Sequence, residues 1–235
     1  METSTRTIDR TGGSHTDPAP GRDRPEQIAK ALEEDILFGT LPPGARLIED
    51  NLMARFGATR HFIRQALLQL EREGIVAREK NKGAAVLSLD PAEVRRIYEV
   101  REMLQRQAAL MIRLPADPTA LRELEQIQQK YRAAVAAADY RAVHELNDRF
   151  HVTLFSACDN RYLVDTIKYF MQLSLPVRAK TMADSDKLKV SVRHHGMMIE
   201  LLKGTDNWAL AQLCVEHLQP AKTHYLQRLV EADPA

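Results

Sequence analysis

Apolar residues recur at helical spacing along almost the whole chain, and breaker sequences divide them into separate segments. The first run places Ile28, Leu32 and Ile36 on one face, and "GTLPPG" ends it. Two short stretches, "IVARE" and "AAVLS", are typical of β strands instead, with "KNKG" as the turn between them. The pattern predicts helices over about 25–38, 49–56, 60–73, 92–112, 118–137, 139–157, 160–175, 186–203 and 206–230, with both strands between the third and fourth helices.

The order of these segments predicts a mostly α protein with two folded parts. Residues 1–22 are rich in Thr, Gly, Ser, Asp and Pro, a composition typical of a disordered tail. Residues 23–88 combine three helices with a β hairpin, which is the arrangement of a winged helix-turn-helix domain. Residues 89–235 contain only helical segments and are expected to form an all-helical bundle.

The helix expected at 60–73 has one apolar and one polar face. Phe62, Ala66 and Leu70 repeat every four residues and are predicted to pack inward. The opposite face carries four polar side chains in its first two turns, the part of a recognition helix that reaches base edges. Arginine suits guanine, glutamine suits adenine, and a threonine at the N-cap can meet a phosphate. The candidate DNA-contacting residues here are Thr59, Arg60, His61, Arg64 and Gln65.

The distribution of charge agrees with a nucleic-acid surface on this domain. Residues 51–88 contain seven Lys or Arg and three acids, hence +4, whereas residues 22–50 contain four and seven, hence −3. The whole chain has a net charge of only +1, so the basic character is local. On charge alone, a solvated face of Arg and Gln would explain the pattern equally well. The basic turn "KNKG" favours DNA binding.

Composition argues against several other classes of protein. Of the 235 residues, 44% are hydrophobic and 28% are charged, as in ordinary globular proteins. Cys158 and Cys214 lie far apart and form no CxxC pair, which argues against a disulfide framework or a cysteine zinc site. No apolar run approaches the roughly 18 residues of a membrane span, and the first residues lack the apolar core of a secretory signal. A cytoplasmic protein is therefore expected.

A histidine in the bundle region has two polar neighbours at helical spacing. In "NDRFH", helix geometry brings His151 close to either Asn147 or Asp148. A rotation of about 100° per residue puts Asn147 on the shoulder of the apolar face that Val143 marks, and His151 on the same side. Asp148 is predicted to face mostly outward, and His144 is a weaker candidate for an inward position.

Two more histidines lie within the apolar faces of their own helices. One core-facing histidine is usually a hydrogen-bonded core residue, because a buried imidazole needs a partner. Three of them on three helices predict a metal site, since helical bundles build such sites from facing helices. Three imidazoles and one oxygen suit Zn²⁺, Ni²⁺ or a similar divalent ion, with open positions for a bound anion. The candidate ligands are Asn147, His151, His195 and His217.

The stretch "ILFGTLPPGARLIEDNLMARFGATRHFIRQALLQLEREGIVAREKNKGAAV" resembles the DNA-binding domain of the GntR family of bacterial transcription regulators. That family shows patterns such as G-x-L-x-P-G-x-x-L-x-E, V-S-R-x-x-V-R-E-A-L and a wing ending in R-G-A-x-V. The resemblance covers about fifty residues in order. It implies that Thr59, Arg60 and Arg64 contact operator DNA, with Lys82 and Gly83 in the wing.

The recognition helix departs from the family pattern at three positions. His61 and Phe62 stand where Thr-Pro is common, and Gln65 stands where Glu is usual. A neutral side chain in place of a carboxylate offers different hydrogen bonds to a base, so no operator sequence is carried over from the family.

The segments "YEVREMLQRQAALMIR", "NDRFHVTLFSACDNRYL" and "HHGMMIELLKGTDNWALAQLCVEHL" resemble the FadR-type ligand-binding domain, or FCD domain, over roughly residues 91–231. In many members an Asp or Asn three residues before Phe-His joins three histidines around a metal. Here that residue is Asn147, and a neutral amide oxygen is a poorer ligand than a carboxylate. The resemblance implies a small carboxylate effector, and Arg101 either faces its pocket or lies on the helix surface.

These observations predict a transcription regulator that binds double-stranded operator DNA as a homodimer, under control of a small carboxylate and a divalent metal. Two other classes remain open, a helical metal-dependent hydrolase and a helical interaction protein without catalysis. The chain has no G-x-S-x-G, P-loop or G-x-G-x-x-G motif, and Asn147 cannot act as a base beside the metal. A protein that is not an enzyme is therefore expected.

Overall fold

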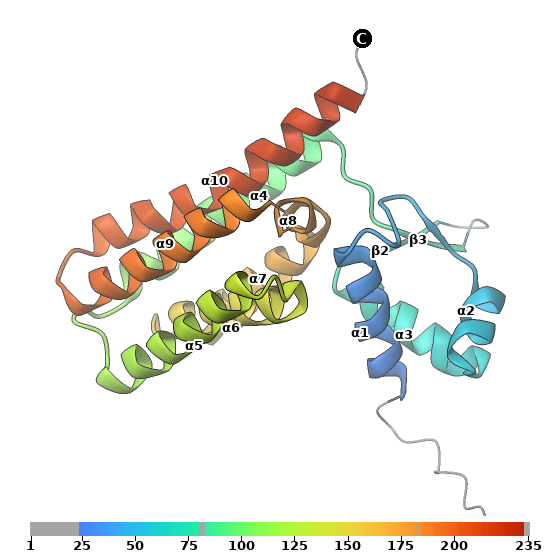
Figure 1. Ribbon diagram of the computed structural model, residues 1–235, viewed down its shortest axis with the longest axis horizontal. Helices are drawn as coiled ribbons and strands as arrows, with labels where there is room; N and C mark the ends of the chain where they lie inside the picture. The colour runs from blue at the N-terminus through green and yellow to red at the C-terminus, as the bar shows by residue number, and fades with distance from the viewer. Residues whose placement is uncertain (1–23, 80–82, 183, 233–235) are drawn as a thin grey trace, which may run out of the picture.

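A computed structural model describes residues 24–79, 83–182 and 184–232 (Figure 1). The tail expected at 1–22 and the wing residue Lys82 lie outside these residues. The described elements are α1 (Arg24–Leu37), β1 (Arg46–Leu47), α2 (Glu49–Phe56), α3 (Arg60–Arg72), β2 (Val76–Glu79), β3 (Gly83–Val86), α4 (Pro91–Met111), α5 (Pro118–Ala136), α6 (Tyr140–Ser156), α7 (Arg161–Leu173), α8 (Leu175–Met182), α9 (Ser185–Lys203) and α10 (Asn207–Ala232).

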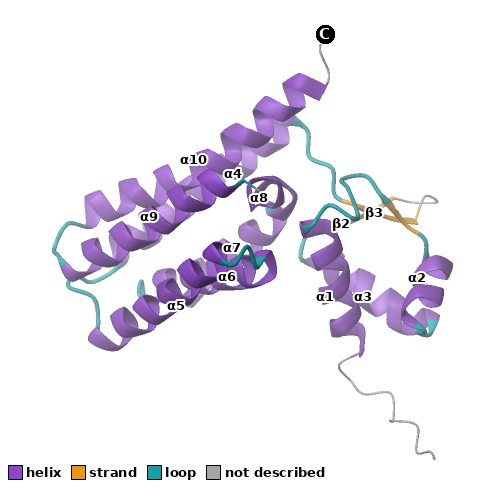
Figure 2. Ribbon diagram, in the orientation of Figure 1, coloured by secondary structure: helices purple, strands orange, loops and turns teal. Residues whose placement is uncertain are grey.

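The N-terminal part is the expected winged helix domain, with one correction to its sheet. It has three helices and a small antiparallel sheet of strand order β1-β3-β2, in which β1 follows α1 and the other two strands follow α3 (Figure 2). The sequence predicted only a two-stranded hairpin. The additional strand, β1, pairs with β3 through Arg46 opposite Ala85 and Leu47 opposite Ala84. A strand of two residues is too short to show the alternation by which strands are recognised in a sequence.

Local signals place the recognition helix α3 directly after a tight turn. Gly57 ends α2 with a φ of +55°, a left-handed conformation that glycine adopts without strain. Thr59 then caps α3, and its hydroxyl accepts a hydrogen bond from the Phe62 backbone N–H. Ile63 and Ala66 on the inner face of α3 are fully buried in the core of this domain. The polar face of α3 is left toward solvent.

The C-terminal part is the expected helical bundle, in which α4 and α10 lie along each other (Figure 1). Asp90 starts α4 with a capping box, because its carboxylate accepts from the Glu93 N–H while the Glu93 carboxylate accepts from the Asp90 N–H. None of the described helices is both long and apolar enough to cross a membrane.

One bundle helix was not predicted from the sequence. The segment "LP" at 175–176 was expected to break the chain between two helices, but α8 begins there and continues to Met182. Proline is well tolerated in the first turn of a helix, since the N–H it lacks has no partner there. Pro176 therefore lies near the start of a helix and not in a loop.

The two domains are packed against each other at α8 and the end of α7. Leu175 is fully buried and belongs to the hydrophobic core of the winged helix domain. Gly74 has a φ of +73°, and a Cβ added there would lie 2.9 Å from Leu173 Cδ1. Glycine at position 74 thus serves both the backbone conformation and the close approach of the bundle.

Candidate metal centre and ligand pocket

Three histidine side chains from three helices meet inside the bundle. The Nε2 atom of His151 on α6 lies 3.0 Å from Nε2 of His217 on α10 and 3.3 Å from Nε2 of His195 on α9. One ring nitrogen from each of the three lies within 4.8 Å of the others. His151 and His195 are buried and His217 is partly buried. The structure therefore brings together the three histidines named from the sequence.

Each imidazole of this cluster is held in its neutral form. Burial lowers the pKa of His151 and His195 well below the ordinary value. Repulsion that would arise among the histidines if they were protonated lowers each pKa further, and for His151 the charges of Arg101 and Arg178 add to it. Burial also lowers the pKa of His217 to about 3. A neutral imidazole has a lone pair, and it is the form that binds a metal.

The spacing between Nε2 of His151 and Nε2 of each of the other two histidines fits a divalent cation. With metal–nitrogen bonds of about 2.0–2.1 Å, two ligands lie about 3.0 Å apart at a right angle and about 3.4 Å apart at a tetrahedral angle. The 3.0 and 3.3 Å separations at His151 fall on these values. Hydrogen bonds alone leave the cluster poorly satisfied, because in the described part of the chain the buried Nδ1 atoms of His151 and His195 have no partner.

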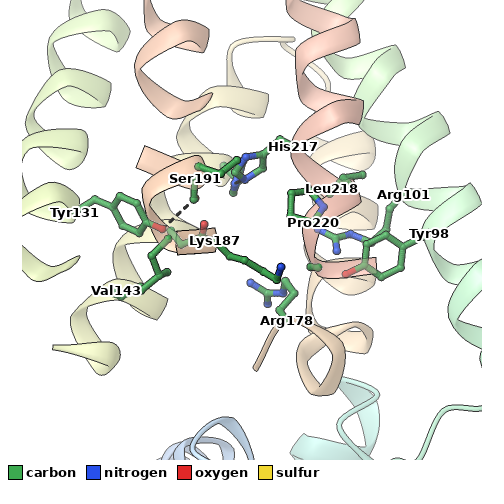
Figure 3. Close-up of a pocket in the computed structure, with 15 residues that line it drawn as sticks. Tyr98, Arg101, Tyr131, Val143, Arg178, Lys187, Ser191, His217, Leu218 and Pro220 are labelled. Carbon is green, nitrogen blue, oxygen red and sulfur yellow. Dashed lines mark hydrogen bonds between the residues drawn. The ribbon is translucent and has the colours of Figure 1, made fainter. Parts of the chain in front are cut away.

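A pocket with a volume of about 80 Å³ opens beside the cluster (Figure 3). Asn147, His151 and His217 line it, so the amide named with the histidines lies in the same site. The Asn147 amide nitrogen donates to an Asp148 carboxylate oxygen at 3.1 Å. The remaining lining residues are Tyr98, Arg101, Tyr131, Val143, Arg178, Lys187, Leu188, Val190, Ser191, Leu218, Pro220 and Ala221.

Arg101 lies in this pocket, and not on the helix surface that the sequence left open. Its side chain donates to the Ser174 hydroxyl at 3.0 Å, lies over the Tyr98 ring and is only 4% exposed. Burial lowers the pKa of Arg101 to about 10, which still leaves the guanidinium charged at neutral pH. A buried cation at a pocket wall attracts an anionic ligand.

The prediction that Asp148 faces mostly outward is wrong. Its side chain is 21% exposed, and its carboxylate accepts from both terminal nitrogens of Arg178, with 3.3 Å for one of them. Rotation around α6 alone does place Asp148 away from the apolar face. The neighbouring helix α8, which was not predicted, covers that side of α6 and supplies the arginine.

Sequence reasoning therefore missed two cationic residues of the pocket, Arg178 and Lys187. Arg178 lies on α8 and Lys187 in the first turn of α9, where Asp184 caps the helix. Because the segment around Arg178 was interpreted as a break, no face was assigned to it. The proline near the start of α8 was the signal that could have identified the helix.

The other side of α6 contacts the winged helix domain. His144 lies 3.6 Å from Glu33, and Lys30 lies 2.7 Å from Glu145. His144 is therefore directed toward α1 and does not join the metal cluster. One helix thus carries candidate metal ligands on one side and ionic contacts to the DNA-binding domain on another.

The candidate DNA-contacting residues of α3 are all exposed, as a contact surface requires. This holds for Thr59, Arg60, His61, Arg64 and Gln65, and Gly83 at the start of β3 is exposed too.

Acidic residues of α2 hold the two arginines of α3. Arg64 Nε donates to Glu49 at 2.9 Å, and Arg60 contacts Asp50 at 2.6 Å. The pKa of Glu49 is lowered, mainly by its hydrogen bond from Arg64. These ion pairs are solvent-exposed, so each costs little to exchange for a phosphate or a base.

Comparison with known families gives two matches along the chain. Residues 24–86 match the family described as bacterial regulatory proteins of the gntR family, and residues 96–220 match the FCD domain. The two matches follow the order of the winged helix domain and the helical bundle in the structure.

Curated relatives and solved structures agree with these matches. The chain is 27% identical to the HTH-type transcriptional regulator YdhC of Bacillus subtilis, over 87% of this chain and 92% of that protein. It is 26% identical to the HTH-type transcriptional repressor RspR of Escherichia coli, over 83% and 85% of the two chains. The structure of E. coli McbR/YncC has a TM-score of 0.74 at 20% identity, with 88% and 98% covered, and so shares the fold.

Proposed function

Because the chain belongs to the GntR family of bacterial regulatory proteins and carries an FCD domain, we propose that it is a regulator whose operator binding responds to a small carboxylate. The carboxylate would bind a divalent metal in the helical bundle. The observation that carries this proposal is the convergence of three neutral histidines, two of which line the same pocket as the buried Arg101. The cluster can bind a metal, and the arginine can bind an anion.

On the DNA side, two copies of the winged helix domain would read two half-sites of a palindrome. Arg60 and Arg64 would exchange their carboxylate partners for guanine or phosphate, and Gln65 would contact a neighbouring base. Thr59 and Gly83 lie where a helix N-cap and a wing meet the DNA backbone. The exposure of these side chains and the basic charge of residues 51–88 support this assignment.

On the ligand side, His151, His195 and His217 would hold Zn²⁺ or Ni²⁺, with the amide oxygen of Asn147 as a weaker fourth ligand. When bound, the metal supplies a positive centre with open positions for a carboxylate. Arg101 would donate hydrogen bonds to the same carboxylate and orient it. The guanidinium is held by its hydrogen bond to the Ser174 hydroxyl and by its contact with the Tyr98 ring.

The proposed coupling between the two sites runs through α6 and α8. A ligand at His151 and Asn147 shifts the equilibrium between arrangements of these helices only if it binds one arrangement better. Both helices contact α1, so such a shift would reorient the winged helix domain. The outcome would be release of the operator, in line with the repressor function that the name of RspR states for that relative.

A hydrolase built on the same metal cluster is a poorer explanation. It would need a carboxylate free to take a proton from metal-bound water. Asp148, the acid nearest the cluster in sequence, pairs with Arg178, which outweighs the effect of burial and lowers its pKa. A carboxylate held in this way is a weak base.

The proposal is tested with the purified full-length chain. Selection from genomic fragments should return a two-fold symmetric site that the protein binds as a dimer. In metal-loaded protein, at least one of acetate, lactate, succinate, malate and citrate should change the affinity for this site by about fivefold or more. Removal of the metal with a chelator should abolish that response. A protein without sequence-specific sites, or one that hydrolyses carboxylate esters at the metal, would disprove the proposal.

A further inference from the structure

We propose that the effector is a dianion, with one carboxylate at the histidine cluster and Arg101 and a second anionic group at Arg178 and Lys187. This inference rests on the proposed function, because it specifies the ligand of the same pocket. It assigns the two residues on α8 and α9 a role in selecting between singly and doubly charged ligands.

The first anion position is defined by Arg101. This guanidinium is almost completely buried and donates to the neutral Ser174 hydroxyl. In the described part of the chain its Nε atom has no hydrogen-bond partner, and no carboxylate forms an ion pair with it within 4.0 Å. A buried cation without a counterion is costly, so a ligand carboxylate that pairs with Arg101 contributes a full negative charge where one is missing.

The second anion position lies where α8 and the start of α9 meet the pocket. Arg178 and Lys187 extend into the same region of the pocket, whereas Arg101 enters from α4 with Tyr98 (Figure 3). Arg178 is 6% exposed, and the Lys187 side chain is 30% exposed. The pocket therefore has a buried cation and a more accessible one at this position.

The carboxylates that pair with these two cations do not line the pocket. Asp148 pairs with Arg178 but is not among the lining residues, and Asp184 lies 3.7 Å from Lys187, which is too long for a hydrogen bond. Among the described lining residues three are cationic and none is acidic. A divalent metal at the neutral histidines would add further positive charge. A monocarboxylate offsets only part of this charge, whereas a dianion can place one group at each end.

The size of the pocket limits which dianions fit. Its volume is about 80 Å³, and one water needs about 10–15 Å³ on this measure, so it holds roughly five to eight non-hydrogen atoms. A short dicarboxylate fits this space without rearrangement. A long acyl chain or a nucleotide does not.

The test compares two ligands of equal carbon number on the metal-loaded full-length protein. Succinate carries a carboxylate at each end of four carbons, and butyrate carries one. Isothermal titration calorimetry at moderate salt should give a dissociation constant for succinate that is lower by about tenfold or more, since a charge-assisted hydrogen bond contributes this much. Malonate and glutarate, which are shorter and longer, report the separation of the two anion positions.

The variant Lys187→Gln removes one cation of the second position without emptying a buried site. It should lower the preference for succinate over butyrate by about fivefold or more, because only succinate has a carboxylate that reaches the second position. Lys189→Gln is the matched control, because Lys189 lies two residues further on α9, is 71% exposed and pairs with Asp186 outside the pocket. A second variant, Arg178→Lys, retains the charge but loses the fork geometry, and it should reduce succinate affinity more than butyrate affinity.

The outcomes separate the inference from the proposed function. If butyrate binds as tightly as succinate and Lys187→Gln changes neither affinity, the dianion inference is wrong, while the proposal of a carboxylate effector stands. If neither mono- nor dicarboxylates bind the metal-loaded protein, both fail together. A preference for succinate that Lys187→Gln reduces and Lys189→Gln preserves supports the second anion position. Metal content and thermal unfolding of each variant show whether it is folded.

Discussion

The guanidinium of Arg178 on α8 forms an ion pair with the carboxylate of Asp148 on α6, the residue next to Asn147. Burial would raise the pKa of Asp148, but the charge of Arg178 outweighs burial and leaves it below its ordinary value. Burial would lower the pKa of Arg178, and the same pairing raises it instead. Both groups are charged at neutral pH. Their pairing joins α6, which carries the pocket residues Asn147 and His151, to α8, which packs against α1 of the DNA-binding domain.

Removal of this charge pair should destabilise the protein. In Asp148→Asn, Arg178 remains buried with a weaker partner, and we expect a loss of about 1–3 kcal/mol of unfolding free energy at pH 7. Because the pKa of Asp148 is lowered in the folded protein, its contribution is complete above the unfolded pKa of about 3.9 and is lost as pH falls further. Urea denaturation should show the difference from wild type at pH 7 and pH 5, and a smaller one below pH 4.

A control for this change exists on α7. Asp165 also pairs with a cation, Lys168, but its side chain is 57% exposed. Asp165→Asn should change the unfolding free energy by no more than about 0.5 kcal/mol. Equal losses of unfolding free energy in Asp148→Asn and Asp165→Asn would show that burial of the Asp148 pair adds nothing to stability.

The bundle core shows which parts of the site the sequence could reveal. His151, His195 and His217 each lie on an apolar helix face, and apolar periodicity is strong enough over long helices to give the direction of a side chain. Their meeting point followed from the expectation of a bundle. The structure confirms that all three come together.

Arg178 shows what apolar periodicity could not reveal. Its helix spans eight residues and begins at "LP", so it is too short to display a periodic face. The environment of Asp148 depends on this helix, and for that reason the outward direction predicted for Asp148 was wrong. Long-range contacts that a short helix makes are not encoded in the spacing of either partner.

The metal cluster should lose its metal when its histidines are changed. In the double variant His195→Ala and His217→Ala only His151 and the Asn147 amide remain, which is too few ligands for tight binding. Elemental analysis should give close to one metal ion per wild-type chain and almost none in the variant. His224→Gln is the control, because His224 lies on α10 two turns beyond His217 and outside the pocket lining. Full metal content in the double variant would disprove the site.

The metal-free protein should become less stable as the pH falls below about 6.5. The pKa of His217 is about 3 in the folded protein and has its ordinary value of 6.5 in the unfolded chain. Between these values the unfolded chain binds a proton that the folded chain does not. Each such histidine therefore lowers the free energy of unfolding by about 1.4 kcal/mol for each pH unit of acidification. Thermal unfolding with a chelator from pH 7.5 to pH 5 should show this decline. The decline should be smaller in His217→Gln, and an unchanged pH dependence in that variant would contradict the assignment.

The exposed arginines of α3 should determine operator affinity. Arg64→Ala removes a side chain that can contact a guanine or a phosphate, and we expect a loss of about 1–3 kcal/mol in binding free energy. Arg72→Ala is the control, since Arg72 is also exposed but lies at the opposite end of α3. Fluorescence anisotropy with the selected operator at moderate salt measures both. A change within twofold for Arg64→Ala would show that the recognition helix is assigned wrongly.

The ion pairs between α6 and α1 should carry the effector signal to the DNA-binding domain. Arg141 of α6 pairs with Glu34 of α1, whereas Arg149 of the same helix pairs with Glu123 of α5 within the bundle. Their side chains are 59% and 58% exposed, so they differ in partner and hardly in environment.

Arg141→Ala should therefore leave effector affinity unchanged, because Arg141 does not line the pocket. It should reduce the effector-induced change in operator affinity, which for such coupled sites is typically about 5–150-fold in the intact protein. Arg149→Ala should leave that change at its wild-type value. The measurement is operator affinity with and without saturating effector for each variant. If both variants respond as the wild type does, the signal does not pass through the α1–α6 contact, and the packing of Leu175 of α8 in the winged helix core is the remaining route.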